Sequence, residues 1–512
     1  MIAPVHPTKE RKSVAIVGGG IAGLTAALRM QEAGYEVHIY EKRDRVGGKI
    51  RSKQSGEQVT DLGAEFIDSD RHELIGLAKE LGIKLVPAGG NSGVRFRLAS
   101  GKMIDEQTFN EAFKPIAQRI EQDKQAITHD PMGERAQVLD QMSMSQYLHE
   151  LNKDLGGRRS LLSRLSGKNN GVSEEIIDAA EKFYASEAGR PASDISALQY
   201  VHESGGTKGF LRSDAALQVE GGTQRLTEAL KAKLEETGAE FHMGKELSEI
   251  GKAKHDKFSL GFADGEELRT FDHVVMATQA HHLTHVKGMN KFIPSDDLEA
   301  LGDVQHTHNA KIAVKMKTPP IDDELYVSSL GFQAWSREPG ETVFLVGGEL
   351  AQKYKGKKLV DVVLEDYAKA HNTTVEKLFD DKPESITYVG PDPTDPCYPS
   401  PASGQAIRLK QIARNMDEAT VRQGIGFVGN YIPDTQDGSI GFMANGVNSA
   451  ERATSNLMNI ELARQQAREM HDREAGEKIV RVLETFDPVG IGFAGDDETL
   501  PPPPGSKKGH HL

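Results

Sequence analysis

The sequence predicts an α/β protein that begins with a parallel sheet, and three observations near its start indicate this class. Val14–Val17 is a short apolar run of the kind that forms a buried parallel strand. A glycine-rich turn and a helix-like run follow it directly. Val37–Tyr40 is a second apolar run, and Glu41 stands at its carboxyl end. Strand, turn, helix, strand and acid in this order are typical of a Rossmann-like fold that binds a dinucleotide.

The glycines of the turn have the spacing that pyrophosphate binding requires. Gly18, Gly20 and Gly23 fit the pattern G-x-G-x-x-G. Gly18 permits the tight turn, Gly20 lets a pyrophosphate approach the backbone, and Gly23 lets the helix pack closely on the strand. The helix that starts near Ile21 and Ala22 would direct its N-terminal N–H groups at that phosphate.

Glu41 lies where an adenosine ribose would be held. A carboxylate there can accept both ribose hydroxyls, and it repels a 2′-phosphate. The alternative is a glycine-rich turn that holds no ligand.

A second glycine loop follows at once. Gly47 and Gly48 indicate another place where backbone meets a ligand, with Arg43 and Lys49 near phosphates. Simple NAD-binding dehydrogenases do not need this loop. Asp61–Phe66 then offers a further approach point made of small residues. The cofactor is therefore expected to be longer or more deeply enclosed than NAD, which favours FAD.

These segments resemble the flavin-dependent amine oxidases, of which monoamine oxidase is the best-known member. Glu41–Lys49 matches the family's E-x-R-x-R-x-G-G-[RK] loop, and Asp61–Phe66 matches its D-x-G-[GA]-x-[FYW] segment. The resemblance implies an extended FAD whose isoalloxazine ring faces a substrate cavity. The cofactor contacts that it implies in these two segments are Glu41, Lys42, Arg43, Gly47, Gly48, Lys49, Gly63, Ala64 and Glu65.

Later segments continue the resemblance. Asp194–Tyr200 is similar to a D-x-S-A-L segment that leads into a helix bordering the cavity. Glu220–Leu226 returns the chain to the cofactor domain, and Leu247 in the strand region that follows is placed on the adenine side. His273–Thr278 is a buried strand whose small residues, Ala277 among them, could lie over FAD.

Val304–Lys317 is predicted to contain a strand with the family's lysine, which holds a water against flavin N5. The apolar pattern places this lysine at Lys311, with Lys315 as the other register. A solvent-facing strand lysine is the alternative.

Cys397-Tyr398 resembles a Cys-Tyr pair that some members direct at the flavin. In those members the cysteine is bonded to the 8α-methyl group, and the tyrosine is half of an aromatic cage. Phe442 takes the position of the second aromatic residue. The alternative is that Cys397 is a small core residue and that FAD is bound noncovalently.

The last cofactor segment is similar to the family's F-x-G-[ED] and G-[YF]-M-x-G-A patterns, with two departures. Asn430 replaces an acid, and Asn445 stands where the family has glycine. Gly429 is expected against the ribityl or pyrophosphate group. The helix opened by Met443 would direct its N-terminus at the flavin pyrimidine, where negative charge grows on reduction.

Two further groups of polar residues are candidates for substrate or metal binding. Glu203 occupies a place where the family often has a cavity-lining glutamine, and its carboxylate could hold the distal cation of a diamine or polyamine. A surface glutamate at a helix end is the alternative. No Cys or acidic partner has ligand spacing around His281, His282 and His285, or around His306 and His308, so no metal site is predicted.

The domains are expected to be discontinuous. The FAD-binding domain takes 1–90, 216–295 and 420–465, and an α+β substrate domain with a mixed sheet and helices takes 91–215 and 296–419. A polar helix at 466–486 and a disordered Gly/Pro-rich tail at 487–512 complete the chain.

Composition limits the partners. The net charge of −14 argues against nonspecific binding to nucleic acid or anionic membranes. The chain shows neither an apolar run long enough to span a bilayer nor a signal-peptide pattern, and a single cysteine fits a reducing compartment, so the cytoplasm is expected. The oligomeric state is open.

The expected reaction oxidises an amine or amino acid to an imine. The substrate gives a hydride equivalent to flavin N5, O2 reoxidises the flavin and yields H2O2, and water hydrolyses the imine. A related FAD enzyme that desaturates C–C bonds in a porphyrin or carotenoid, and a flavoprotein without turnover, are the alternatives.

Overall fold

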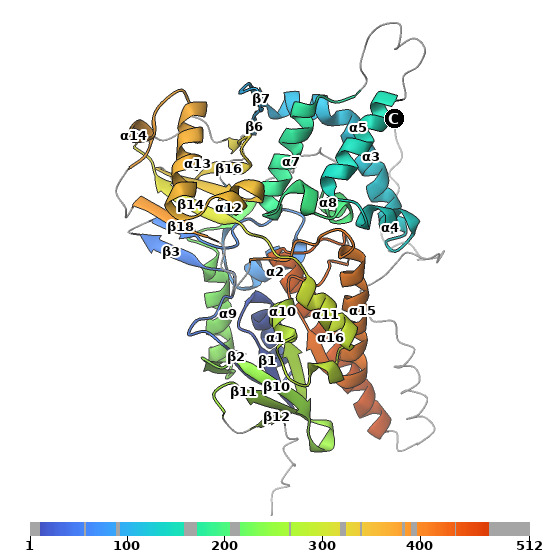
Figure 1. Ribbon diagram of the computed structural model, residues 1–512. Helices are drawn as coiled ribbons and strands as arrows, with labels where there is room; N and C mark the ends of the chain where they lie inside the picture. Colours follow the sequence, from blue (N-terminus) through green and yellow to red (C-terminus); the bar gives the residue numbers. More distant parts are fainter. Residues whose placement is uncertain are drawn as a thin grey trace, which may run out of the picture.

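The computed structural model describes residues 11–55, 58–88, 93–157, 171–204, 216–265, 268–317, 324–337, 340–380, 385–390, 397–435 and 437–469. They form two lobes, one above the other in Figure 1. A five-stranded parallel sheet lies in the lower lobe, and a seven-stranded mixed sheet lies in the upper lobe. The predicted fold class is confirmed. The predicted tail 487–512 and all but the first residues of the predicted helix 466–486 lie outside the described residues.

The parallel sheet gathers strands from distant parts of the chain. Its order is β19 (Ile425–Phe427), β13 (His273–Met276), β1 (Ser13–Val17), β2 (Glu36–Glu41) and β9 (Glu240–Met243). One face is covered by α1 (Ile21–Glu32), α9 (Gln224–Glu236) and α16 (Met443–Glu469). Because Val14–Ile16 are fully buried, β1 has the continuous apolar character of a central parallel strand.

The other face of this sheet carries a small antiparallel sheet and helices. The strands are β10 (Leu247–Lys252), β11 (Phe258–Phe262) and β12 (Arg269–Phe271), and the helices are α10 (Ala280–Leu283), α11 (Ser295–Asp303) and α15 (Ala406–Gln423). Leu301 of α11 and Ile412 of α15 share one core with Ala15 and Met276. Parts of the segment 296–419 therefore pack in the lower lobe.

The mixed sheet of the upper lobe is mainly antiparallel. Its order is β18 (Ile386–Val389), β14 (Ala310–Lys315), β17 (Glu341–Val346), β16 (Phe332–Arg337), β15 (Leu325–Val327), β6 (Val94–Arg97) and β7 (Met103–Asp105). The helices of this lobe are α3 (Glu106–His129), α4 (Glu134–Asp140), α5 (Met144–Gly157), α7 (Glu174–Ala188), α8 (Ala197–Glu203), α12 (Gly348–Lys353), α13 (Gly356–Ala370) and α14 (Val375–Leu378).

The ends of these helices follow local sequence. Asp105 caps α3 by accepting a hydrogen bond from the Thr108 N–H at 2.8 Å, and α3 continues through Pro115. The Ser143 hydroxyl accepts from the Gln146 N–H at 3.2 Å at the start of α5. The buried stripe Phe109, Phe113, Ile116 and Ile120 is core, as its spacing predicts.

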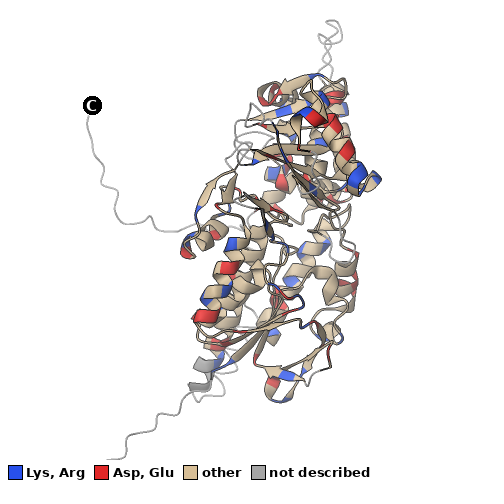
Figure 2. Cartoon of the chain, turned by 90° about the vertical axis from the view of Figure 1, so that its left-hand side faces the viewer, with Lys and Arg blue, Asp and Glu red and all other residues tan. Residues whose placement is uncertain are grey.

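Short elements complete the chain. They are β3 (Ser52–Ser55), β4 (Gln58–Asp61), α2 (His72–Glu80), β5 (Leu85–Pro87), β8 (Leu217–Val219) and the 3₁₀ turns η1 (Ala192–Asp194), η2 (Lys254–Asp256) and η3 (Met289–Lys291). Acidic and basic residues are interspersed along both lobes (Figure 2). In the part of the chain that the structure describes, no helix combines the length and the apolar character needed to cross a membrane.

Candidate active site

The turn after β1 needs glycine at two of its three motif positions for the protein's own packing. Gly18 has φ +116°, and a Cβ there would lie 2.5 Å from the carbonyl oxygen of Ala277. A Cβ at Gly23 would lie 1.9 Å from the carbonyl oxygen of Gly18. For Gly20 the nearest atom is the Gly48 Cα at 3.9 Å. The space over Gly20 is therefore open to a ligand.

The second glycine loop lies directly against this turn. The Gly47 N–H donates to the Gly19 carbonyl at 2.8 Å, and Gly47 bridges to Gly20. Arg45 shapes the loop by donating to the carbonyls of Val46, Gly48 and Ile50. Sequence reasoning missed Arg45, although it is the second arginine of the E-x-R-x-R motif.

Glu41 fastens the two loops together. Its buried carboxylate accepts from the Gly19 N–H at 2.7 Å and from the Arg43 N–H at 2.9 Å. The expected contact with a ribose stays a prediction. The Lys42 Nζ lies 3.0 Å from the His282 Nε2.

The segment 61–66 packs on the second loop. A Cβ at Gly63 would lie 1.9 Å from the Lys49 carbonyl oxygen, so only glycine fits. The Ala64 N–H donates to the same oxygen at 3.4 Å. The backbone of the glycine turn 18–23 thus packs on the loop 43–49, and this loop packs on the segment 61–66.

Lys311 joins the mixed sheet to this layered region. It lies on β14, pairs with the Glu65 carboxylate and donates to the Gly63 carbonyl at 3.3 Å. Glu65 also pairs with the Arg337 Nε at 3.0 Å and accepts from the Trp335 Nε1 at 3.3 Å. The predicted lysine and the predicted acid are therefore in direct contact.

The same network continues along β16 and β17. The Arg337 Nη2 lies 2.7 Å from the Asp61 Oδ2, and Asp61 accepts from the Thr223 N–H at 2.9 Å. Glu341 accepts from the Thr60 hydroxyl at 3.0 Å, and burial raises the pKa of its carboxyl. Sequence reasoning missed Arg337 and Glu341, since no motif marks them.

Both departures from the family pattern have a structural role. The Gly441 N–H donates to the Asn430 carbonyl at 2.7 Å, and the Asn430 amide donates to the Gly441 carbonyl at 3.3 Å. Asn445 accepts from the Phe442 N–H at 2.9 Å and donates to the Ser439 carbonyl at 2.9 Å. Asn445 is the third residue of α16 and reaches back to the N–H of Phe442, the residue before the helix, as the third residue of a capping box does.

The start of α16 packs against the start of α1. A Cβ at Gly446 would lie 3.3 Å from the Ala22 Cβ and 3.5 Å from the Ile21 Cγ2. Met443 is the first residue of α16, and Gly429 donates its N–H to a serine hydroxyl of that helix at 3.0 Å. The predicted cofactor segments around Ile21 and Met443 are thus adjacent.

The two predicted cage residues lie in neighbouring segments. A Cβ at Gly441 would lie 3.3 Å from the Tyr398 Cδ2, and Phe442 follows directly. The Tyr398 hydroxyl donates to the Glu187 carbonyl, and burial raises its pKa. The guanidinium of Arg71 lies 5.0 Å from the centre of the Phe442 ring.

Glu203 is the last residue of α8. Its carboxylate accepts hydrogen bonds from the Tyr184 hydroxyl and the Gln199 amide. Its charge also contributes to the raised pKa of Tyr398. Cys397 is partly exposed beside that tyrosine.

The remaining predicted positions are more peripheral. Leu247 is the buried first residue of β10. The rings of His281, His282 and His306 pack together, with His281 4.2 Å from His282 and 5.2 Å from His306. In the described ranges these histidines do not form a group of three metal-ligand atoms. Burial lowers the pKa of His306 to about 4.

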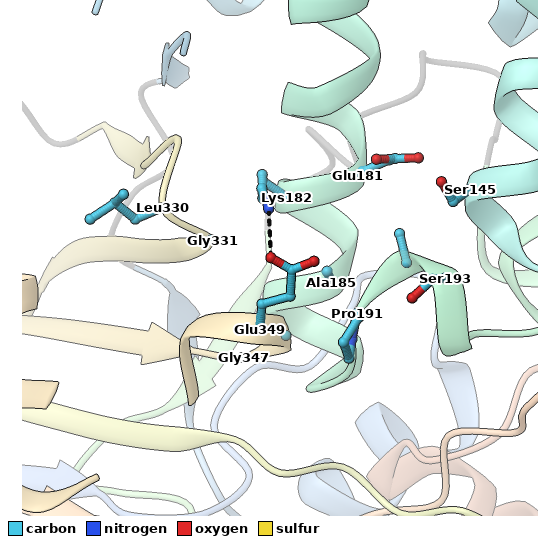
Figure 3. Close-up of a pocket in the computed structure, with 12 residues that line it drawn as sticks. Ser145, Glu181, Lys182, Ala185, Pro191, Ser193, Leu330, Gly331, Gly347 and Glu349 are labelled. Carbon is cyan, nitrogen blue, oxygen red and sulfur yellow. Dashed lines mark ion pairs between the residues drawn. The ribbon is translucent and has the colours of Figure 1, made fainter. Parts of the chain in front are cut away.

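A separate pocket of about 90 Å³ lies in the upper lobe between α7, η1 and the start of α12 (Figure 3). The Lys182 Nζ lies 3.7 Å from the Glu349 carboxylate there. Because sites for cofactors and drug-sized ligands have roughly 300–1,000 Å³, this pocket is too small to hold a dinucleotide. None of the predicted site residues lines it.

Comparison with known proteins decides the family. A family model described as flavin containing amine oxidoreductase matches residues 21–456. The chain belongs to this family. As a member of it, the protein has FAD as its cofactor.

Several relatives of this flavin-containing amine oxidoreductase are known. A protein of Mycobacterium tuberculosis described as a flavin-containing monoamine oxidase is 28% identical over 43% of this chain and 48% of its own length. The putrescine oxidase of Kocuria rosea is 40% identical over 15% of this chain and 16% of its own length. The chain thus matches about half or less of these relatives. The solved cyclohexylamine oxidase from Brevibacterium oxydans IH-35A has a TM-score of 0.71 at 15% identity, covering 88% of this chain and 99% of that one, and shows the fold alone.

The residues of this family member fit its cofactor. The space over the Gly20 backbone is open, and α1 begins at the next residue, so its N-terminal N–H groups lie beside that space. The acid at the end of β2 is present, and α16 begins against α1. These features are the donors and the space that a pyrophosphate needs.

Proposed function

We propose that this chain oxidises an amine or an amino acid to an imine, with FAD held at the junction of α1, the loop 43–49 and α16. The observation that carries the proposal is the position of Lys311. This lysine reaches from the mixed sheet to Glu65 and Gly63, in the segment that packs on the glycine loops. The proposed division is that the lower lobe binds FAD and the upper lobe binds the amine.

Bound FAD supplies the acceptor for a hydride equivalent from the substrate's α-carbon and passes the electrons to O2, which yields H2O2. Water then hydrolyses the released imine to an aldehyde or ketone and to ammonia or an amine. The chain's own residues have to orient the amine, exclude bulk water and control protons.

Lys311 is the proposed water-holding residue. An ammonium group has three donors, and in this protein Glu65 and the Gly63 carbonyl take two of them. The third remains to hold a water beside the reacting edge of the cofactor. Lys315 lies on the same face of β14, and Lys311 is the lysine that pairs with Glu65 of the segment 61–66.

Tyr398 and Phe442 are the proposed walls for the amine. Tyr398 lies beside Gly441, the residue before Phe442, and this supports the role because it places the two aromatic residues in neighbouring segments. An aromatic, poorly hydrated site favours the neutral amine, which is the form that can lose hydride. The Tyr398 hydroxyl is held by the Glu187 carbonyl, so the ring orientation is fixed.

Glu203 is the proposed anchor for a second positive charge on the substrate. Tyr184 and Gln199 orient its carboxylate, and its charge acts on Tyr398. A distal ammonium of a diamine would pair with it. The likeness to a putrescine oxidase supports this choice of substrate class. The single cysteine supports a location in the cytoplasm.

A panel of monoamines, diamines and amino acids, assayed for peroxide release, tests the proposal. We expect at least one amine class to give peroxide and the matching carbonyl product. Lys311→Met should keep FAD bound and lower turnover by about 10²-fold or more, whereas Lys315→Met should stay close to wild type. Unchanged turnover in Lys311→Met would show that the wrong lysine has been assigned.

Glu203→Gln separates the diamine role from a surface role. The variant should raise KM for diamines by about 10-fold or more while leaving monoamine turnover unchanged. Equal effects on both substrate classes, or none, would remove the anchor from the proposal.

A further inference from the structure

Two histidines and a glutamate converge on neighbouring strands at the edge of the parallel sheet. His38 lies on β2, and Glu240 and His242 lie on the edge strand β9, where His38 is directly opposite Glu240. The His38 Nδ1 lies 3.3 Å from the Glu240 Oε2 and 3.4 Å from the His242 Nε2. The His242 Nε2 lies 3.5 Å from the same carboxylate oxygen. Three potential ligand atoms therefore form a nearly equilateral triangle.

The size of this triangle matches a tetrahedral metal ion. Ligand atoms about 2.0–2.1 Å from a tetrahedral zinc lie roughly 3.3–3.4 Å from one another. Two imidazole nitrogens and one carboxylate oxygen are also a ligand set that zinc takes in proteins, with water in the fourth position. Within the described part of the chain, this is the group of three or more His, Cys, Asp or Glu residues whose ligand atoms converge.

A second carboxylate, that of Glu36, orients His38 for metal binding. The His38 Nε2 lies 3.0 Å from the Glu36 carboxylate. An Nε2–H that donates to Glu36 leaves the Nδ1 lone pair directed at the triangle. Carboxylate partners of this kind fix the tautomer and raise the basicity of metal-binding histidines.

The neighbouring rings hold the two imidazoles in place. The His242 ring stacks on Tyr40 with ring centres 4.5 Å apart, and His38 lies 5.3 Å from Phe271. The side chains of His38 and His242 are 12% and 17% exposed, while that of Glu240 is 58% exposed. The site is thus preformed on the buried side and open to solvent through the glutamate.

The local charge permits a cation. Glu36 and Glu240 bring two negative charges to the site. Arg269 lies on the facing strand β12 and contacts the Tyr40 hydroxyl at 3.4 Å, which opposes them with one positive charge. Lys245 is nearby and is paired with Asp264. The net charge of these side chains is therefore negative before a divalent ion binds.

We propose that His38, His242 and Glu240 form a zinc site that clips the edge strand β9 to β2. Glu41, the residue that fastens the two glycine loops, ends the same strand β2. Zinc would therefore stabilise the lobe that carries the cofactor loops, and this role is independent of the amine chemistry.

Zinc titration of the chelator-treated, FAD-loaded protein tests the site after removal of any affinity tag. We expect one equivalent of Zn²⁺ per chain by elemental analysis, and a heat-denaturation midpoint raised by about 2 °C or more at saturation. Glu240→Gln should weaken zinc binding at least tenfold, and because Glu240 is exposed this variant should fold. Glu36→Gln should weaken it by about 10–100-fold through loss of the supporting carboxylate.

His242→Gln should abolish the stoichiometric zinc, while His129→Gln, a control at an exposed helix end, should leave it unchanged. The proposal is overturned if wild-type protein retains no zinc above the level of His242→Gln. It is also overturned if Glu240→Gln binds zinc as tightly as wild type, because the paired histidines would then be joined only by a hydrogen bond.

Discussion

At the scale of single residues, the contact between the lobes depends on charges that are almost wholly buried. Arg337 is 5% exposed and lies between Asp61 and Glu65, which are 0% and 4% exposed. Lys311 shares Glu65. A buried pair contributes little when complete, yet the loss of one partner leaves an uncompensated charge and costs about 3–5 kcal/mol.

We predict that Arg337→Met lowers the free energy of unfolding by about 3–5 kcal/mol and weakens FAD retention, because buried Asp61 loses its guanidinium partner and buried Glu65 keeps Lys311 alone. Urea titration of the FAD-loaded protein measures the change. Arg95→Met is the matched control, since Arg95 is 43% exposed in its pair with Glu324, and a shift of at most about 1 kcal/mol is expected. Equal effects in the two variants would contradict the role of burial.

Half-buried His306 gives a prediction for the pH dependence of stability. Its pKa is lowered to about 4 by burial, against 6.5 for an unfolded chain. The unfolded state therefore binds the proton first, and stability is lost as pH falls from 6.5 towards 4. Stability at pH 5 relative to pH 7 should improve in His306→Gln and not in His308→Gln, the exposed neighbour. Heat denaturation at the two pH values measures this difference, and identical pH dependence in all three proteins would refute it.

At the scale of elements, the start of α16 depends on one side chain. Asn445 is 1% exposed and makes two hydrogen bonds, to the Phe442 N–H and the Ser439 carbonyl. These bonds fix the segment that carries Phe442. The asparagine thus replaces, by a side-chain cap, the tightness that glycine gives in the family pattern.

We predict that Asn445→Ala lowers the free energy of unfolding by about 1–2 kcal/mol, because two buried hydrogen bonds at the start of the helix are lost. The variant should also raise KM for the amine, since Phe442 is no longer held. Asn459→Ala, an exposed change later in the same helix, should have neither effect. Chemical denaturation and steady-state kinetics on the three proteins check the prediction, and a silent Asn445→Ala would disprove the cap.

The elements that could be predicted are those whose signal is local. β1, the glycine turn, α1 and β2 follow from adjacent residues with fixed spacing, and Asp61–Phe66 follows from its small residues. The contact of Arg337 with Asp61 could not be predicted, because it depends on the register of β16 against β17 and on pairing across 276 positions. The convergence of His38 and His242 was missed for the same reason, since β2 and β9 are distant in sequence.

At the scale of the whole molecule, segments more than 400 residues apart in the sequence, α1 and the start of α16, meet at one place. The turn after β1, the loop 43–49, the segment 61–66 and the start of α16 pack in succession, and Lys311 approaches them from the mixed sheet. The sequence resemblance predicted each of these segments separately. These segments surround the open backbone at Gly20, and the proposed cofactor site therefore lies at the junction between the lobes.

Anaerobic mixing of the purified yellow protein with the amine panel tests this account most directly. At least one amine or amino acid is expected to bleach the flavin absorbance, and O2 is expected to restore it with formation of one equivalent of peroxide. Bleaching should be at least about 10²-fold slower in Lys311→Met with its FAD in place. A flavin that is bound but is not bleached by any amine or amino acid would contradict the proposed function.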